Sequence, residues 1–383
     1  MSTFGSLLAD IRDINGVPKG FLPLHAPLFV GKEREYILET IDSTFVSSVG
    51  AYVTRFENML QDITGMAHAV ACVNGTAAIQ VALHLAGVTP GDLVITQALS
   101  FVATANGICH AGGEPVFLDV DRNTLGLSVK SLQHFLEQSC DKRSGRSFYK
   151  ADGRRIAACV PMHTFGLPCH IDAICAICEE WGIPVVEDAA EALGSRYNGK
   201  HCGSFGSLGT LSFNGNKIVT TGGGGAIVTN DSVLATKGKH LTTTAKRPHS
   251  WEFYHDAVAW NYRMPNLNAA LGCAQLELLE FFIKKKRDLA FQYRSLFDST
   301  PWSFIVEPDN CESNYWLCAV LFDSREERDR FLAESNETGV MTRPVWEPLH
   351  TLPIYQHCVR GSLKNTAFIA DRLVNLPSGV RCE

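Results

Sequence analysis

The amine of Lys217 stands just after a predicted strand, where it could form a covalent bond with a carbonyl compound. It closes the segment Ser212–Lys217, Ser-Phe-Asn-Gly-Asn-Lys, in which an apolar strand pattern runs into a turn. Two threonines and four glycines follow at 220–225. An amine attacks a carbonyl only after losing its proton, which requires desolvation or a neighbouring cation. Most lysines are solvated, so position alone does not single this one out.

Two carboxylates follow another apolar run. Val185 and Val186 lead directly into Glu187 and Asp188, and Glu191 comes three residues later. A buried carboxylate needs a cationic partner, and a protonated pyridine nitrogen would be one. The alternative interpretation is that Asp188 caps a helix that begins after it.

A turn suited to phosphate lies earlier in the chain. Val73 ends a predicted strand, and Asn74-Gly75-Thr76 then opens a helix whose free N–H groups and positive end attract anions. Such turns are common in α/β proteins and carry little weight alone. In combination, Gly75-Thr76, Asp188, Ser212 and Lys217 supply a phosphate cradle, a partner for a ring nitrogen, a phosphate hydroxyl and a Schiff-base amine. These are the groups that pyridoxal phosphate requires.

The elements that must position these residues alternate along the chain. From residue 67, short β-branched runs alternate with amphipathic stretches, which predicts an α/β domain on a mostly parallel sheet. The expected strands are 67–73, 92–96, 115–120, 156–162, 184–187, 208–213 and 225–228, and the expected helices are 75–86, 101–110, 129–138 and 171–181. Ligands of such sheets bind beyond the carboxyl ends of the strands, where the residues described above should meet.

Three parts of the chain are expected: an N-terminal arm at 1–28, a large domain at 29–289 and a small C-terminal α+β domain at 290–383. A long helix over 266–287 should lead out of the large domain, and 141–152 should be a surface loop. The small domain should contain a strand at 315–322 and a helix at 325–334.

Composition argues against several functions. The 34 Lys and Arg against 40 Asp and Glu give a net charge of −6, and the cationic run Lys284–Arg287 is expected to be a solvated helix face rather than a nucleic-acid patch. Without a signal sequence or ~18 uninterrupted apolar residues, a cytoplasmic protein with no membrane attachment is expected. The 13 cysteines should be reduced, and the C-x-x-C pair Cys175 and Cys178 lies mid-helix with no second pair, so no metal site is expected.

From about Phe29 to Pro377 the sequence closely resembles the DegT/StrS-type nucleotide-sugar aminotransferases. The motifs that carry the resemblance are Phe45–Gly50, Asn74–Ala78, Ser100–Asn106, Glu187–Glu191, Ser212–Lys217 and Trp260–Met264. The resemblance implies fold type I of the pyridoxal-phosphate transferases, the fold of aspartate aminotransferase, with a large mostly parallel sheet domain and a smaller C-terminal domain.

The resemblance also implies roles for single residues. Lys217 would bind the cofactor and, once released, move the proton between substrate and cofactor, while Asp188 would keep the pyridine nitrogen protonated. Phe101 would stack on the ring. The implied phosphate ligands are Gly75, Thr76, Ser212 and, reaching in from the neighbouring subunit, Asn261. A homodimer with shared active sites follows.

One position departs from the family pattern. Many relatives have His or Gln where this chain has Glu191, close to the cofactor's phenolic oxygen. A carboxylate there would disfavour the phenolate, so the usual role is not transferred unchanged.

Contacts with the substrate are expected from a second segment, in which Arg343, Trp346 and His350 match residues near the nucleotide sugar in relatives. Core packing is the alternative for Trp346. His163, at a predicted strand end, is a further candidate, with a structural role as its alternative.

The expected reaction moves the amino group of L-glutamate to the C4 keto carbon of a UDP-2-acetamido-4-keto-6-deoxyhexose by a ping-pong route. The motifs look most like the branch that makes 4-amino sugars for bacterial surface glycans, including the legionaminic-acid and bacillosamine routes. One alternative is a pyridoxal-phosphate sugar dehydratase, but relatives of that kind replace the lysine with histidine. The other is an inactive regulatory or scaffolding homologue. The sequence does not determine the nucleotide or the stereochemistry of the sugar.

Overall fold

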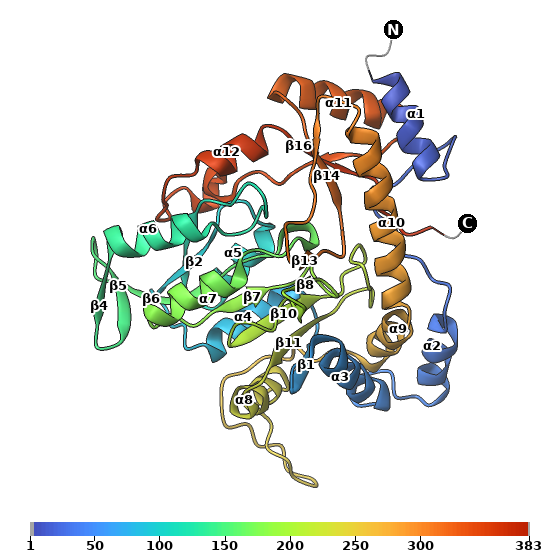
Figure 1. The fold of residues 1–383 in the computed structure, drawn as a ribbon. Helices are drawn as coiled ribbons and strands as arrows, with labels where there is room; N and C mark the ends of the chain where they lie inside the picture. Colours follow the sequence, from blue (N-terminus) through green and yellow to red (C-terminus); the bar gives the residue numbers. More distant parts are fainter. Residues whose placement is uncertain (1–3, 382–383) are drawn as a thin grey trace.

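The computed structural model describes residues 4–381 and joins the predicted strands into one continuous sheet (Figure 1). Its strands, in spatial order, are β1 (His68–Cys72), β11 (Gly225–Thr229), β10 (Leu208–Ser212), β7 (Val186–Asp188), β6 (Arg155–Val160), β2 (Leu93–Gln97) and β3 (Glu114–Leu118). Bridges from Cys159 to Val185 and from Met162 to Asp188 join β6 to β7. All of these strands run parallel except β11, which is antiparallel to β1 and β10. The predicted mostly parallel sheet is confirmed.

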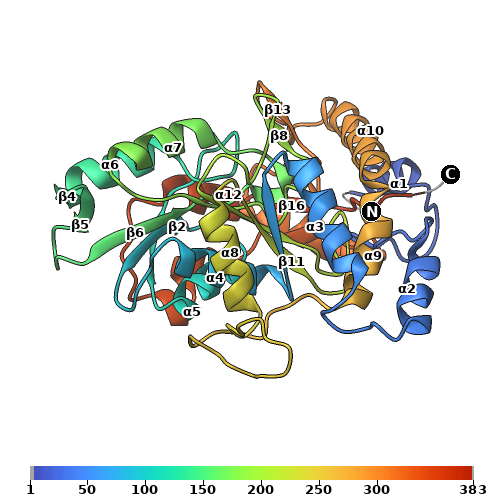
Figure 2. The same cartoon turned by 90° about the horizontal axis from the view of Figure 1, so that it is seen from below.

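Helices cover both faces of this sheet, because successive side chains of each buried strand point to opposite faces. In β1, Val70 and Cys72 pack on one face and Ala69 and Ala71 on the other. The first face carries α4 (Gly75–Leu85), α5 (Val102–His110) and α8 (Ser232–Thr242) (Figure 2). The second carries α3 (Ala51–Thr64), α6 (Val129–Ser139), α7 (Ile171–Glu180) and α9 (Asn266–Leu276).

The prediction of one long helix over 266–287 is wrong, because two helices occupy this range. The chain leaves helical geometry at Leu278 (φ −103°, ψ 3°) and starts a separate helix, α10 (Leu279–Phe297). Because α10 continues past residue 290, the expected domain boundary between 289 and 290 falls inside a helix.

A smaller antiparallel sheet forms the C-terminal unit. Its order is β12 (Ser303–Phe304), β14 (Cys318–Leu321), β16 (Leu373–Leu376) and β15 (Arg343–Pro344), and α11 (Arg325–Glu337) packs against it. The N-terminal arm contributes α1 (Gly5–Ile14), whose Leu8 and Ile11 share a core with Phe297 and Phe331. The helix α1 therefore belongs to the core of this unit.

The surface loop expected at 141–152 is instead largely a hairpin. The strands β4 (Cys140–Arg143) and β5 (Arg146–Tyr149) extend the sheet beside the start of β6. Their residues are too polar to show the apolar alternation by which strands are predicted. The remaining elements are α2 (Glu33–Asp42), β8 (Arg196–Tyr197), β9 (Lys200–His201), β13 (Cys311–Glu312), α12 (Lys364–Ala370) and the 3₁₀ turns η1 (Thr164–Gly166), η2 (Leu349–Thr351) and η3 (Pro353–Tyr355). None of the helices in the described range of 4–381 has both the length and the apolar character needed to cross a membrane.

The cationic run Lys284–Arg287 is not a uniformly solvated face, contrary to expectation. Lys286 is 1% exposed, and its amine donates hydrogen bonds to the carbonyl oxygens of Trp316 (3.1 Å) and Ser378. Burial lowers the pKa of Lys286 to about 7. Helical periodicity alone did not reveal this burial, because the C-terminal chain that covers the lysine lies far away in sequence.

Lys286→Met is expected to change how the free energy of unfolding depends on pH. The folded protein releases the Lys286 proton at about pH 7, whereas the unfolded chain holds it up to about 10.5, so wild-type stability gains from each pH step between these values. Relative to the variant, wild-type stability should rise by up to about 1.4 kcal/mol per pH unit from pH 7 to 9. Urea unfolding measures this, with the exposed Lys284→Met as control; parallel profiles for wild type and Lys286→Met would contradict it.

Candidate active site

The residues predicted to carry the chemistry meet around one pocket of about 320 Å³ at the carboxyl ends of the sheet strands. Asp188 ends β7 and Ser212 ends the adjacent β10, whose register pairs Thr210 with Asp188. Gly75 and Thr76 come from the first turn of α4, and Phe101 precedes α5. Lys217 reaches the same space from the turn after β10. Four separate chain segments thus converge on one volume.

The first turn of α4 and the end of β10 form a tight cradle. Asn74 caps the helix by accepting a hydrogen bond from the Ala77 N–H at 2.8 Å. A Cβ atom at Gly75 would meet the Cβ of Ser212 at 2.9 Å, closer than such atoms approach, so the helix start lies directly on the strand end. The N–H groups of a helix start and the Ser212 hydroxyl together suit a phosphate. The cradle therefore fits the phosphate of the implied cofactor.

Asp188 is a buried carboxylate, 2% exposed. One oxygen accepts a hydrogen bond from the Thr104 hydroxyl at 2.7 Å, and the other accepts from the Ala190 N–H at 3.1 Å. Burial raises the pKa of Asp188, although the bond from Thr104 opposes this effect. The helix-cap interpretation is wrong, because the residues after Asp188 form turns and no helix begins there. A cationic ring nitrogen would supply the charge that this carboxylate lacks.

The amine of Lys217 faces the carboxylate of Glu191. Nζ lies 3.2 Å from Oε1, and the two side chains are 11% and 1% exposed. The other oxygen of Glu191 accepts a hydrogen bond from the Phe165 N–H at 2.9 Å. Burial raises the pKa of Glu191 to about 7, against the opposing effect of the Lys217 charge. Phe165 holds a left-handed backbone (φ 58°), unusual for a residue with a side chain, to deliver this bond.

Aromatic rings form one wall of the pocket. Phe101 is 46% exposed, and its ring centroid lies 6.0 Å from that of Trp346, which in turn lies 5.1 Å from Phe165. Trp346 is thus one residue of the predicted substrate segment that does line the pocket. It also packs against the core cluster that contains Phe165, so its packing and pocket roles coexist.

Three of the residues predicted to contact the substrate lie elsewhere. His163 is fully buried, its Nε2 bonds to Glu187 at 3.0 Å, and its Nδ1 accepts the Cys169 N–H at 3.2 Å, which is the structural alternative. Arg343 lies on the edge strand β15 and donates to the Asn336 side chain. His350 lines a separate cavity with Arg360 and Gln356. None of the three lines the pocket of its own chain.

Asn261 is exposed, and its side-chain oxygen accepts hydrogen bonds from Arg263. It does not line the pocket of its own chain. Its expected contact with a neighbouring subunit stays a prediction.

Other pocket residues were not predicted. Thr104 lies within the Ser100–Asn106 motif, so its hydroxyl could have been found there. Trp316 and Asn216 also line the pocket. Trp316 comes from the chain just before β14, where no local pattern distinguishes it from a core residue.

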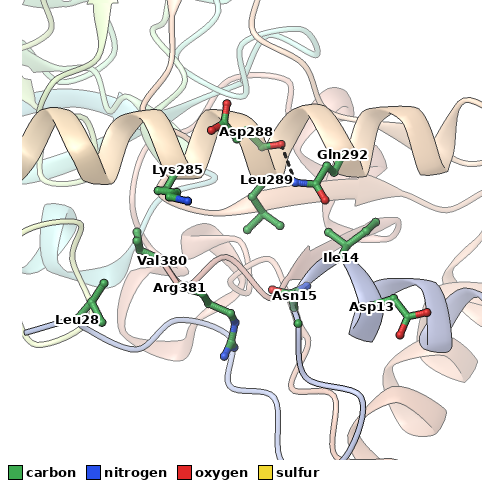
Figure 3. Close-up of a pocket in the computed structure, with 12 residues that line it drawn as sticks. Asp13, Ile14, Asn15, Leu28, Lys285, Asp288, Leu289, Gln292, Val380 and Arg381 are labelled. Carbon is green, nitrogen blue, oxygen red and sulfur yellow. Dashed lines mark hydrogen bonds between the residues drawn. The ribbon is translucent and has the colours of Figure 1, made fainter. Parts of the chain in front are cut away.

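A larger cavity of about 930 Å³ lies between α1, α10 and residues 379–381 (Figure 3). Asn15, Asp288 and Arg381 line it, but none of the predicted cofactor residues does. Across residues 4–381, no group of three or more His, Cys, Asp or Glu side chains could hold a metal ion. The convergent acid, amine and anion-binding groups therefore single out the smaller pocket.

Comparison with known proteins identifies the family. Residues 29–383 match the DegT/DnrJ/EryC1/StrS aminotransferase family. The chain belongs to this family. GDP-perosamine synthase from Escherichia coli O157:H7 is 35% identical over 335 residues, 88% of this chain and 87% of that protein. GDP-perosamine synthase from Vibrio cholerae is 35% identical over 368 residues, 93% of this chain and 94% of that protein.

A solved structure shows the same fold over nearly the whole length. The aminotransferase TlmJ from Streptoalloteichus hindustanus superposes with a TM-score of 0.85 at 28% identity, covering 94% of each chain. This DegT-family chain is therefore a pyridoxal-phosphate-dependent nucleotide-sugar aminotransferase of fold type I, of the kind that serves glycan biosynthesis.

Gly75→Ala is expected to weaken binding of pyridoxal phosphate to the cofactor-free protein roughly 5- to 150-fold, because the new Cβ overpacks the cradle by about 1–3 kcal/mol. Titration of cofactor absorbance measures the affinity. Gly223→Ala is the matched control, since a Cβ there meets no atom within 4 Å. Unchanged affinity in a folded Gly75→Ala protein would show that phosphate does not bind at this turn.

Glu191→Gln is expected to remove a pH dependence of the free energy of unfolding. This dependence runs in the opposite direction to the one that Lys286 causes. The pKa of Glu191 is about 7 in the folded protein and about 4.5 in the unfolded chain, so the folded state holds more protons between these values. Relative to the variant, wild-type stability should therefore fall by up to about 1.4 kcal/mol per unit as pH rises from 5 to 7. Urea unfolding of the cofactor-free proteins tests this, with exposed Glu347→Gln as control; a constant difference between wild type and Glu191→Gln would refute it.

Proposed function

We propose that this enzyme transfers the amino group of L-glutamate to the C4 keto carbon of a UDP-2-acetamido-4-keto-6-deoxyhexose, in the synthesis of a bacterial surface glycan. The observation that carries the proposal is the convergence of Lys217, Asp188 and the Gly75–Ser212 cradle on one pocket. Each group has the chemistry that one part of pyridoxal phosphate needs.

Bound pyridoxal phosphate supplies an electron sink for the charge left when a proton leaves the substrate carbon. Lys217 holds the cofactor covalently, and its free amine later carries that proton. Asp188 keeps the ring nitrogen protonated, a task supported by its burial and its fixed partners Thr104 and Ala190. Phe101 covers the ring face from its exposed position at the start of α5.

The remaining cofactor contacts follow from position. Gly75, Thr76 and Ser212 hold the phosphate at the helix start. Glu191 lies beside the Lys217 amine and accepts its proton, which is the role its 3.2 Å contact supports. In this chain the residue thus serves the lysine, where relatives with His or Gln have no carboxylate to do so.

A second subunit completes the site in this proposal. Of the described residues around the pocket, Lys217 is the one cation, although a cofactor phosphate and a sugar-nucleotide diphosphate bring several negative charges. Exposed apolar side chains offer surfaces for a second copy to cover, at Phe45 and Val49 and on the loop between α8 and α9 at Trp251, Phe253 and Val258. We infer a homodimer in which Asn261 reaches the partner's phosphate site.

The choice of sugar rests on the motifs that resemble the 4-amino-sugar branch. The relatives named above are GDP-perosamine synthases, so the experiment below compares a UDP-linked with a GDP-linked sugar. The presence of Lys217 argues against a dehydratase, whose relatives carry histidine there.

The first experiment compares wild type with Lys217→Ala, each loaded with pyridoxal phosphate. The wild type should show a visible band of covalently held cofactor that L-glutamate bleaches, and the variant should show neither. The aminated wild type should then pass its amino group to the UDP-linked 4-keto-6-deoxy sugar faster than to the GDP-linked one, measured as aminated sugar by mass spectrometry. Preference for the GDP-linked sugar would overturn the assignment of the nucleotide, and a wild type that forms no band would overturn the assignment of Lys217.

A further inference from the structure

The indole ring of Trp316 packs on the amine of Lys217. Nζ lies 3.9 Å from the ring centroid, and Trp316 is 4% exposed. The indole N–H also donates a hydrogen bond to the carbonyl oxygen of Asn216 at 2.7 Å. One side chain therefore touches the reactive atom with its face and holds the turn that carries Lys217 with its edge.

Trp316 is itself fixed from both sides. The backbone N–H of Trp316 donates a hydrogen bond to the Asn314 side-chain oxygen at 2.8 Å. The backbone carbonyl oxygen of Trp316 accepts a hydrogen bond from the buried amine of Lys286 at 3.1 Å. The Asn314 amide donates to the carbonyl oxygens of Glu191 and Leu193, both at 2.9 Å. The segment before β14 is thus tied to the same stretch that presents the Glu191 carboxylate to Lys217.

The fit around Asn314 leaves little room for this segment to move. A Cβ atom at Gly166 would lie 1.9 Å from the Asn314 side-chain oxygen, and the backbone of Gly166 is left-handed (φ 88°). A glycine is required there on both counts. Gly166 directly follows Phe165, whose N–H binds Glu191, so one turn supports both neighbours of the lysine amine.

We propose that Trp316 is a positioning residue for Lys217, holding its free amine beside Glu191 at the place where it bonds to the cofactor. In that step Nζ joins the aldehyde carbon of pyridoxal phosphate, and the aldehyde oxygen leaves as water with the two amine protons. The indole face against Nζ and the indole N–H bond to Asn216 together fix where the amine lies, which an aliphatic side chain does not do. The inference rests on the proposed covalent role of Lys217.

The test measures how fast the lysine links to the cofactor, separately from how tightly the cofactor binds. Cofactor-free wild type, Trp316→Leu, Trp316→Phe and Trp302→Leu are mixed with pyridoxal phosphate. Stopped-flow absorbance follows the covalent band, borohydride reduction with mass spectrometry gives its final yield, and equilibrium dialysis gives total binding. Trp302 is the matched control because it packs on Phe4 and Phe322 in the C-terminal unit.

Trp316→Leu should link more slowly than wild type, by roughly 5- to 100-fold, because the amine is no longer held in place for attack. Total binding should stay within about threefold of wild type, since the phosphate cradle is untouched. Trp316→Phe keeps a ring face and should recover part of the rate, while Trp302→Leu should behave as wild type. A wild-type linking rate in Trp316→Leu would overturn the proposal. So would a Trp316→Phe protein no faster than Trp316→Leu, because the proposal places a ring face, which phenylalanine keeps, against the amine.

Should Trp316→Leu not fold, Trp316→Phe decides alone: a rate below wild type with unchanged total binding supports the proposal, and a wild-type rate overturns it. Lys217→Ala separates this inference from the proposed function. A covalent band in that variant would remove Lys217 from its assigned role, whereas its absence together with a wild-type rate in Trp316→Leu would remove Trp316 alone.

Discussion

The amine of Lys217 and the carboxylate of Glu191 form a buried pair of opposite charges. The surrounding residues must hold this pair in place and satisfy its hydrogen bonds. Removing two charges from water costs free energy that their attraction repays only with good geometry and further hydrogen bonds. The Phe165 N–H supplies one such bond, and Trp316 covers the amine. The left-handed backbone of Phe165 is a local strain of about 1–3 kcal/mol that this arrangement maintains.

The sheet provides the rest of the geometry. Parallel β7 and β10 end at the same rim, so Asp188 and Ser212 arrive together, and the missing Cβ of Gly75 lets α4 start directly on Ser212. Strand ends fix backbone position closely, whereas side-chain direction depends on alternation. Met162 lines the pocket, and the next residue, His163, points away to Glu187. A place at the rim therefore does not by itself make a residue part of the site.

This difference explains what could be predicted from sequence. Asp188 and Ser212 end strands, and Gly75 and Lys217 follow strands, that the local sequence pattern identifies, so their convergence is predictable from that pattern. Trp316, Asn314 and buried Lys286 act across about a hundred residues or through tertiary contacts, which periodicity does not report. The polar hairpin β4–β5 was missed because it buries little, and the break between α9 and α10 occurs without Gly or Pro to mark it.

The same long-range contacts connect two titratable groups, Lys286 and Glu191, through Trp316 and Lys217. Lys286 holds the carbonyl of Trp316, and Trp316 covers the amine that faces Glu191. Burial brings the pKa of each outer group to about 7, from above for Lys286 and from below for Glu191. Lowering the pH charges Lys286, and raising it charges Glu191, so neither direction relieves both desolvation costs. The region around the amine is therefore less stable at neutral pH than a region with apolar packing would be. This loss of stability is the cost of an active site in which an acid and an amine lie side by side.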